Sequence, residues 1–295
     1  MRECSAYTQQ GAVATYIPEL AKANINEFGI CVVSNNNEVN SAGDYDKPFT
    51  MQSIIKPIIL LMALMDNGTE RVRELVGVEA TGKPFDAFNY SDQALSGEHI
   101  NPMINTGAIA LCTLIKGGNY DEKFSRLLEL TRKISDNPDL AVDEQVYLSE
   151  KATGSTNRAL AYMLKAYDLI HDDVEQVLDC YFRACSIRAT SVDLARIAFA
   201  FANGGKVAGE QLFQKEHAKY VNAVLMTCGM DDGSGEFALN VGGPAKSGVG
   251  GGIMAVVPNR MGIGIYSPAL DKKGNSIAGI KALEMLSREL DLSIF

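Results

Sequence analysis

The sequence predicts a mixed α/β protein in which helices flank a mostly antiparallel sheet and an all-helical subdomain packs beside it. Three observations lead to this fold class. Strand-like segments occur near the two ends of the chain, within residues 28–41 and 245–266. The region between them, residues 69–230, is dominated by helical periodicity. An amphipathic segment closes the chain, so the sheet formed by both ends has a helix to cover it.

The N-terminal region predicts one short helix and one hairpin. Residues 11–23 indicate the helix, and residues 28–34 and 38–41 have the composition of two strands. The run Asn35-Asn36-Asn37 between the strands favours a turn. We therefore expect an antiparallel hairpin at the start of the sheet.

The next segment combines two reactive side chains with an apolar helix. Ser53 and Lys56 are three residues apart, so a helix that begins near Ser53 places both on one face, where they can touch. Ser-x-x-Lys is typical of serine nucleophiles, because a buried lysine loses its proton more easily and can then accept that of the hydroxyl. From Ile54 to Met65 nearly every residue except Lys56 is apolar, which predicts a helix inside a core. A chance occurrence is the alternative, since such short motifs are common.

The middle and the end of the chain complete the predicted architecture. The C-terminal strands are expected at residues 245–247, 252–257 and 261–266, followed by a helix over residues 276–290. The middle helices are expected at residues 105–115, 120–134, 143–151, 157–167, 174–184, 191–202 and 215–228. We therefore predict a sheet-containing α/β subdomain from residues 1–50 and 240–295. Residues 51–239 form the helical subdomain, with the Ser-x-x-Lys helix at its start.

Composition and charge narrow the classes of function. The chain has 27 basic and 36 acidic residues, a formal charge of -9, and no basic cluster, which argues against a nucleic-acid partner. The N-terminus lacks the apolar core of a signal peptide, and no apolar run reaches roughly 18 residues, so we expect a cytoplasmic protein without a membrane partner. Six scattered cysteines spell out neither a zinc site nor a redox motif. None of the three histidines lies beside a nucleophile motif, which disfavours a Ser-His-Asp triad.

A second reactive stretch, residues 242–252, is dense in glycine. Glycine weakens a strand and is tolerated mainly where a ligand or another backbone comes close. Lys246-Ser247-Gly248 ahead of a strand is similar to the Lys-Thr-Gly that accompanies Ser-x-x-Lys in penicillin-binding and β-lactamase enzymes. The two motifs together could supply the main-chain amides of an oxyanion hole for acyl transfer. A plain glycine-rich turn is the alternative; a dinucleotide fingerprint does not fit, because a strand follows instead of a helix.

Further motifs, in order along nearly the whole chain, make it similar to the serine-dependent glutaminases. This resemblance implies a β-lactamase/transpeptidase-like fold, in agreement with the architecture predicted above. The motifs are Tyr16-Ile17-Pro18, Gln52-Ser53-Ile54-Ile55-Lys56, Asn101-Pro102-Met103-Ile104-Asn105-Thr106-Gly107-Ala108-Ile109, Ser149-Glu150, Asn157-Arg158-Ala159, Tyr181, Cys185-Ser186, Cys228-Gly229-Met230 and Pro244-Ala245-Lys246-Ser247-Gly248-Val249.

The resemblance implies a glutaminase, an amidohydrolase of linear amides that converts L-glutamine to L-glutamate and ammonia without a metal or organic cofactor. Ser53 would attack the side-chain carboxamide and form a glutamyl-enzyme ester, and Lys56 would accept its proton. The main-chain amides of Ser53 and Val249 would form the oxyanion hole. The family also implies a homodimer or a homotetramer.

The resemblance further implies a set of substrate-binding residues. Glu150 would hold the α-ammonium, the amides of Asn105 and Asn157 the α-carboxylate, and Tyr181 would help to hold the substrate. The pocket would also be lined by Tyr16 and Gln52. Without the resemblance, ordinary structural roles are favoured: helix caps for the two asparagines, a solvated helix charge for Glu150 and core packing for Tyr181.

Asp231 departs from the family pattern. The family normally has tyrosine after Cys-Gly-Met, and that tyrosine reaches the nucleophile and shares in proton transfer. A carboxylate is shorter, charged, and titrates far below a phenol. Asp231 could pair with Lys56 and disable the base, or it could itself accept a proton. The alternative function is therefore a catalytically impaired, glutamine-binding relative. A third reading, a penicillin-type acylase, has weak support in Ser91-Asp92-Gln93.

Overall fold

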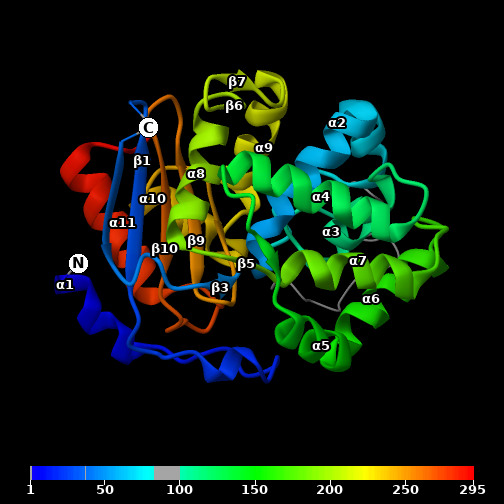
Figure 1. Ribbon diagram of the computed structural model, residues 1–295, viewed down its shortest axis with the longest axis horizontal. Helices are drawn as coiled ribbons and strands as arrows, with labels where there is room; N and C mark the ends of the chain where they lie inside the picture. The colour runs from blue at the N-terminus through cyan, green and yellow to red at the C-terminus, as the bar shows by residue number, and fades with distance from the viewer. Residues whose placement is uncertain (1, 37, 83–99) are drawn as a thin grey trace.

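A five-stranded antiparallel sheet forms one half of the molecule, as the computed structural model shows for residues 2–36, 38–82 and 100–295, the residues that it describes (Figure 1). β1 pairs along its whole length with β10, from Gly29 opposite Tyr266 to Ser34 opposite Met261. The two ends of the chain therefore build one sheet, as predicted; the predicted turn residue Asn37 lies outside the described residues. The strand order is β2 (Val39–Gly43), β1 (Gly29–Ser34), β10 (Met261–Tyr266), β9 (Gly252–Val257), β8 (Ala245–Ser247).

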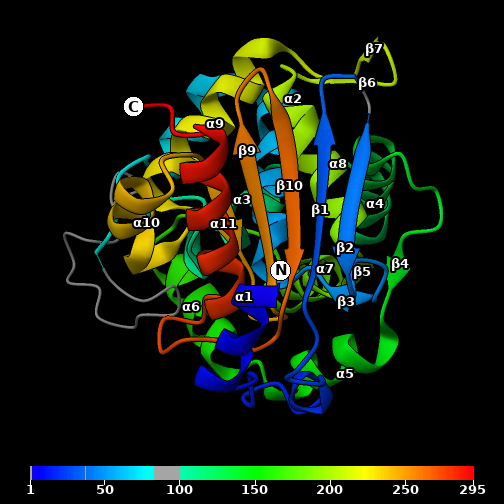
Figure 2. The same cartoon turned by 90° about the vertical axis from the view of Figure 1, so that its left-hand side faces the viewer.

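Helices cover both faces of this sheet (Figures 1 and 2). One face packs against α11 (Ile277–Leu290), whose residues share a hydrophobic cluster with β9 and β10. α1 (Arg2–Ser5) and η1 (Ala6–Gln10) lie beside that helix. The other face packs against α8 (Ser191–Ala202). A Cβ on Gly262 of β10 would lie 2.1 Å from the main-chain nitrogen of Phe199, so glycine lets α8 approach the sheet closely. α8 falls within the span predicted as helical subdomain and yet packs on the sheet; the predicted subdomain boundaries stay a prediction.

The other half of the molecule is helical (Figure 1). α2 packs against α3, α4 and α9, and the helices predicted for this region are present close to their predicted ends. Among the helices in the described ranges, none is long and apolar enough to cross a membrane. The helices are α2 (Lys56–Leu75), α3 (Asn105–Leu114), α4 (Tyr120–Ser135), α5 (Glu144–Thr153), α6 (Ser155–Ala166), α7 (Val174–Cys185) and α9 (Lys215–Cys228). The short helix α10 (Ser234–Asn240) lies on the sheet side, beside α11 (Figure 2).

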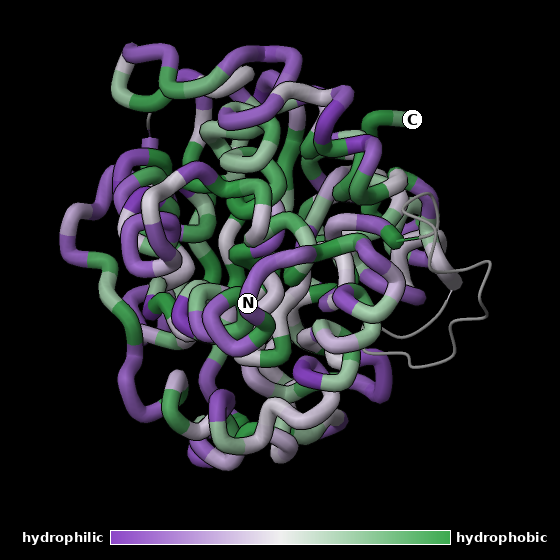
Figure 3. Tube along the Cα trace, turned by 90° about the vertical axis from the view of Figure 1, so that its right-hand side faces the viewer, coloured by the Kyte–Doolittle hydropathy of each residue, from purple (hydrophilic) through white to green (hydrophobic). Residues whose placement is uncertain are grey.

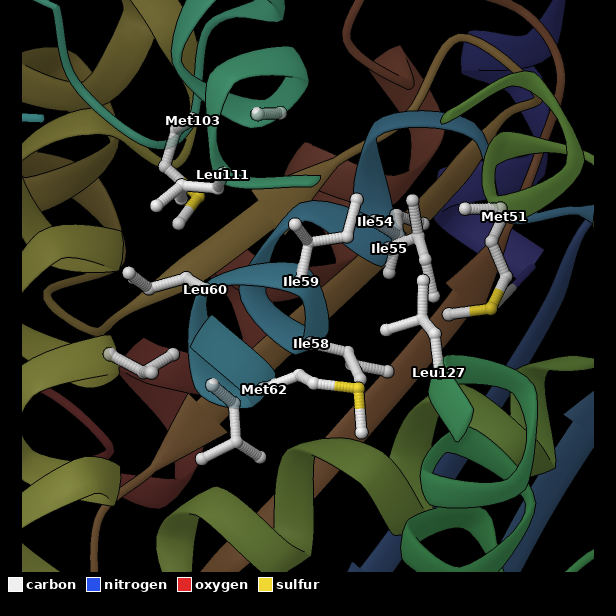
Figure 4. Close-up of a cluster of buried hydrophobic side chains, with 14 of the residues drawn as sticks. Met51, Ile54, Ile55, Ile58, Ile59, Leu60, Met62, Met103, Leu111 and Leu127 are labelled. Carbon is white, nitrogen blue, oxygen red and sulfur yellow. The ribbon is translucent and has the colours of Figure 1, made fainter. Parts of the chain in front are cut away.

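The first half of α2 lies in the core, as its composition predicts. Ile58 and Ile59 have no exposed surface, and the side chains of Met103, Leu111 and Leu127 surround this part of the helix (Figure 4). Figure 3 shows the same arrangement along the chain, with hydrophobic segments inside and hydrophilic ones towards the outside. The buried helix fixes the start of α2, where Lys56 lies, in a rigid and water-poor place.

Several short elements were not predicted, because two or three residues are too few to show a period. β5 (Ile187–Ala189) is the central strand of a three-stranded sheet with β3 (Phe49–Thr50) and β4 (Ala141–Val142). A separate hairpin consists of β6 (Lys206–Val207) and β7 (Glu210–Gln211). The 3-10 turn η6 (Asp231–Gly233) was not predicted either. The short helix expected within residues 11–23 is the 3-10 turn η2 (Leu20–Lys22), and the helix expected to begin near Ser53 starts as the 3-10 turn η3 (Gln52–Ile55). The small sheet matters for function because β3 directly precedes the Ser53 segment.

Candidate active site

Ser53 lies in η3, between β3 and the buried helix α2. The preceding residue, Gln52, has a φ of 50°, in the left-handed region that residues with a side chain seldom adopt. The Met51 amide donates a hydrogen bond to the Ile187 carbonyl (2.9 Å), which ties the segment to β5. The turn is therefore held in a strained conformation by its surroundings, a feature that clusters at functional sites.

Lys56 is fully buried at the first residue of α2. Its Nζ donates hydrogen bonds to Asn105 Oδ1 (2.7 Å) and to the Met103 carbonyl (3.1 Å). Burial lowers the pKa of Lys56 to about 7, with a further lowering by the charge of Lys246. A lysine with this pKa can accept a proton near neutral pH. The predicted direct contact with Ser53 is not among the hydrogen bonds between described residues.

Asn105 connects Lys56 to two other predicted site residues. Its Oδ1 accepts hydrogen bonds from Lys56 and from the Tyr181 hydroxyl (3.2 Å), and its Nδ2 donates to Asn157 Oδ1 (2.9 Å). Neither asparagine is a helix cap: Ile104 precedes α3 in that position, and Asn157 lies inside α6. Their side chains therefore form a polar network, buried at Asn105 and half-buried at Asn157, instead of closing a helix end.

Glu150 is a buried carboxyl group, not a solvated helix charge. Its side chain is on α5 with only 5% of the residue exposed. Burial raises the pKa of Glu150 to about 8, although Gln52 and Lys56 oppose the shift. Its Oε2 has no hydrogen-bond partner among the described residues. A buried oxygen of this kind is suited to a ligand that brings a cationic donor.

One cavity unites most of the predicted site residues, although they come from segments far apart in the sequence. Tyr16, 55% exposed, is the most open of them. Thr153 and Thr156 also line the cavity and were not predicted, because only the packing of α5 and α6 shows which of their side chains face it. Cys185, from the Cys185-Ser186 motif, lines it as well, although no role in the site was predicted for it. The predicted residues that line it are Tyr16, Gln52, Ser53, Asn105, Glu150, Asn157 and Tyr181.

The glycine-dense stretch packs against the Ser53 segment, as expected for a close approach of two backbones. A Cβ on Gly248 would lie 2.6 Å from the Met51 carbonyl oxygen, and one on Gly250 would lie 2.5 Å from that of Thr50. Only glycine fits at such distances. The two motifs that the sequence separates by almost the whole helical region are therefore neighbours.

Val249 lies between these two glycines, outside the lining of the cavity itself. Within the part of the chain that the structure describes, the main-chain amides of Val249 and Ser53 donate no hydrogen bond to another residue. Both amides are therefore available to a ligand, which is the condition that an oxyanion hole has to meet.

Asp231 begins η6, with a φ of 54°. Its Oδ2 lies 3.5 Å from the Nζ of Lys246, and the two side chains are 7% and 0% exposed. The sequence left open whether Asp231 pairs with Lys56. In the structure the described ion pair joins it to Lys246. The other weak sign, Ser91-Asp92-Gln93, lies outside the described residues.

Comparison with known proteins gives consistent matches. The model of a family described as Glutaminase matches residues 11–295. A glutaminase of Clostridium tetani is 52% identical over 100% of this chain and 97% of its own length. A glutaminase of Clostridioides difficile is 52% identical over 98% of this chain and 94% of its own.

Solved structures agree with these matches. A probable glutaminase from Bacillus subtilis complexed with 6-diazo-5-oxo-L-norleucine has a TM-score of 0.91 and 38% identity over 100% of this chain and 94% of that one. A covalent complex of a Bacillus subtilis glutaminase with 5-oxo-L-norleucine has a TM-score of 0.91, at 37% identity over 100% of this chain and 97% of that one. The chain covers 65% of Mglu in its tris and glutamate form, with a TM-score of 0.94 and 35% identity over 100% of this chain. The predicted β-lactamase/transpeptidase-like fold is thereby confirmed.

Proposed function

This chain belongs to the glutaminase family, and we propose that its cavity binds L-glutamine and hydrolyses the side-chain amide to L-glutamate and ammonia through a Ser53 glutamyl-enzyme. The observation that supports this most strongly is the convergence of Ser53, Lys56 and Glu150. The hydroxyl of Ser53 and the buried Glu150 carboxyl group with its free oxygen line one cavity. The buried amine of Lys56, with a pKa of about 7, reaches that cavity through its hydrogen bond to Asn105, which also lines it. Together they suit an amino-acid amide.

The buried polar side chains provide a place for both charged groups of the amino acid. Glu150 Oε2 has no partner, so the α-ammonium of glutamine can donate to it and restore its ionised form. The Asn105 and Asn157 amides, already joined to each other, are the donors for the α-carboxylate. Tyr181 orients Asn105 through its hydroxyl. These contacts leave the side-chain carboxamide to extend towards Ser53, with Gln52 and Tyr16 beside it.

The proposed reaction is an acyl transfer in two steps. Neutral Lys56 takes the proton of Ser53 as Oγ attacks the carboxamide carbon, and the main-chain amides of Ser53 and Val249 stabilise the resulting oxyanion. Lys56 then gives the proton to the leaving nitrogen, the C–N bond breaks, and ammonia leaves while the glutamyl group stays on Ser53 as an ester. Water attacks that ester, with Lys56 again as the base, and releases glutamate.

An assay of ammonia release by the unmodified chain tests the proposal directly. We expect release from L-glutamine well above background, with L-asparagine as the shorter comparison substrate. A purified, folded protein that frees no ammonia from glutamine would refute the proposal. The alternative of an impaired relative, silenced at Asp231, is not supported by the comparisons, and turnover by the unmodified chain would exclude it.

A cytoplasmic location and a homodimer or homotetramer are part of the same proposal. All six cysteines are free in the structure, which fits a reducing compartment. The oligomeric state rests on family membership, and light scattering after size-exclusion chromatography measures it. A monomer at working concentration would contradict this part.

Glu150→Gln is expected to weaken glutamine binding by about 10- to 100-fold, the contribution of a hydrogen bond to a charged group. The same change should stabilise the empty protein. The folded pKa of about 8 lies above the normal carboxyl value, so the wild type loses stability as pH rises from the unfolded value towards 8. Glutamine at position 150 resembles the protonated form and avoids that loss.

Calorimetry and melting curves at pH 5 and pH 8 measure both effects of Glu150→Gln. The melting temperature of the variant should exceed that of wild type by at least about 2 °C at pH 8, and by less at pH 5. Glu129→Gln is the control, because the Glu129 side chain is 55% exposed on α4 and should change neither property. Equal affinity of Glu150→Gln and wild type for glutamine would rule out the proposed role.

Gly248→Ala is expected to lower kcat by about 10²-fold, because its Cβ would push against the Met51 carbonyl at 2.6 Å and displace Ser53. Gly235→Ala is the matched control, since a Cβ on Gly235 meets nothing within 4 Å. Circular dichroism checks that both variants fold. Full activity in Gly248→Ala would show that the glycine stretch does not position the nucleophile.

A further inference from the structure

Two buried lysines and one aspartate lie on elements next to the Ser53 segment. Lys56 directly follows η3, β8 with Lys246 packs against η3, and Asp231 pairs with Lys246. Lys56 on α2 and Lys246 on β8 have no exposed surface, and the charge of Lys246 lowers the pKa of Lys56. Asp231 is in direct contact with only one of them, Lys246, among the described ion pairs. Burial disfavours an ammonium, and a carboxylate in contact restores it. Because Asp231 pairs with Lys246, it favours the charged form of Lys246.

The fold fixes Asp231 beside Lys246. The Met230 amide donates to Ser234 Oγ (3.1 Å), which in turn donates to the Asp231 carbonyl (2.9 Å). The residue before Met230, Gly229, touches β8 so closely that a Cβ there would lie 1.7 Å from the Ala245 carbonyl oxygen. The short turn η6 is thus held against the strand that carries Lys246, and the ion pair does not depend on a flexible loop.

Lys56 is surrounded differently. Its hydrogen-bond acceptors, Asn105 Oδ1 and the Met103 carbonyl, are neutral and accept from an amine as well as from an ammonium. The titratable groups that influence it are Glu150 on α5, Cys185 on α7, Asp231 on η6 and Lys246 on β8. Those that influence Lys246 are Asp231 and Cys228 on α9.

We propose that Asp231 and Lys246 form a positioning pair for the base: Asp231 keeps Lys246 charged, and the Lys246 ammonium keeps Lys56 free of its proton. The pair replaces the tyrosine expected at position 231 without disabling Lys56. This inference rests on the proposed roles of Ser53 and Lys56. After burial, the charge of Lys246 is the strongest influence that lowers the pKa of Lys56, and Asp231 is the strongest that opposes the lowering of the Lys246 pKa.

The pair is tested by measuring how kcat depends on pH in three proteins. These are wild type, Lys246→Met and the double variant Lys246→Met/Asp231→Asn. The value of kcat reports on the complex with glutamine, in which the α-ammonium of the substrate keeps Glu150 ionised. The rise of kcat with pH on the acidic side of the profile, here called the acidic limb, therefore follows the loss of the Lys56 proton. In Lys246→Met the repulsion disappears while Asp231 remains, so the limb should move up by about one pH unit. At a pH below the limbs of both proteins, kcat of the variant should therefore be about tenfold lower than that of wild type. The double variant removes both opposing charges, so its limb should move back towards wild type.

A merely structural role for the pair predicts a different result. Each change would then lower activity at every pH, and the double variant would be the worst of the three. That pattern, or an acidic limb unchanged in Lys246→Met, overturns the inference. Lys133→Met, an exchange of a 59% exposed lysine, is the control and should leave the limb in place.

A second measurement on the unmodified protein does not depend on how the variants fold. An NMR titration of 13C-labelled lysine side chains should show Lys56 losing its proton at a lower pH than Lys246, with Lys56→Met assigning the Lys56 signal. The reverse order overturns the inference even if the enzyme is active. Failure of the proposed function has another signature, which is the absence of ammonia release from wild type at any pH.

Discussion

Ser53→Ala is expected to reduce ammonia release from glutamine by at least about 10³-fold. Alanine removes the Oγ that forms the glutamyl ester, and the loss of a covalent nucleophile costs far more than the loss of a binding contact. Glutamine binding should persist, because Glu150, Asn105 and Asn157 are unchanged. Calorimetry should therefore detect binding without turnover.

Ser135→Ala is the matched control for this change. Ser135 is fully buried, on α4, and its hydroxyl donates to the Thr131 carbonyl, away from the cavity lining. Its variant should retain wild-type kcat. Turnover by Ser53→Ala at a rate close to that of wild type would show that another group is the nucleophile.

Lys56→Met is expected to lower kcat by about 10²- to 10⁴-fold, the usual contribution of a general base. In wild type, kcat should rise with pH through about 7, because burial lowers the pKa of Lys56 to that value and only the neutral amine accepts the Ser53 proton. The variant has no group that titrates there, so its residual rate should show no such limb. Rate measurements from pH 5.5 to pH 9 with saturating glutamine distinguish the two.

The same substitution has an expected effect on stability. The folded pKa of Lys56 lies below its unfolded value, so the wild type gains stability as pH rises from about 7 towards the normal lysine pKa. Lys56→Met should melt higher than wild type at pH 7, with a difference that shrinks as pH rises. A variant that is less stable at pH 7, and whose stability depends on pH as that of wild type does, would contradict a Lys56 pKa lowered by burial.

Long, regular elements were predicted well from the sequence. The strands β9 and β10 and the helices α8 and α9 have their predicted ends, because each has a clear period and turn residues beside it. The small sheet of β3, β4 and β5 was missed, since its strands exist only through pairing with distant segments. That sheet supports the turn at Ser53, so the local geometry of the nucleophile could not be predicted.

The sequence by itself determined the two reactive motifs, the alternation of strands and helices, and the positions at which the chain matches its family. These depend on neighbours along the chain, and the order of residues records them. The tertiary structure alone decided that Asp231 pairs with Lys246, that Glu150 is buried enough to raise its pKa to about 8, and that Asn105 links Lys56 to Tyr181. Charge states and ion pairs follow from distance and exclusion of water, which are set when segments remote in the sequence pack together.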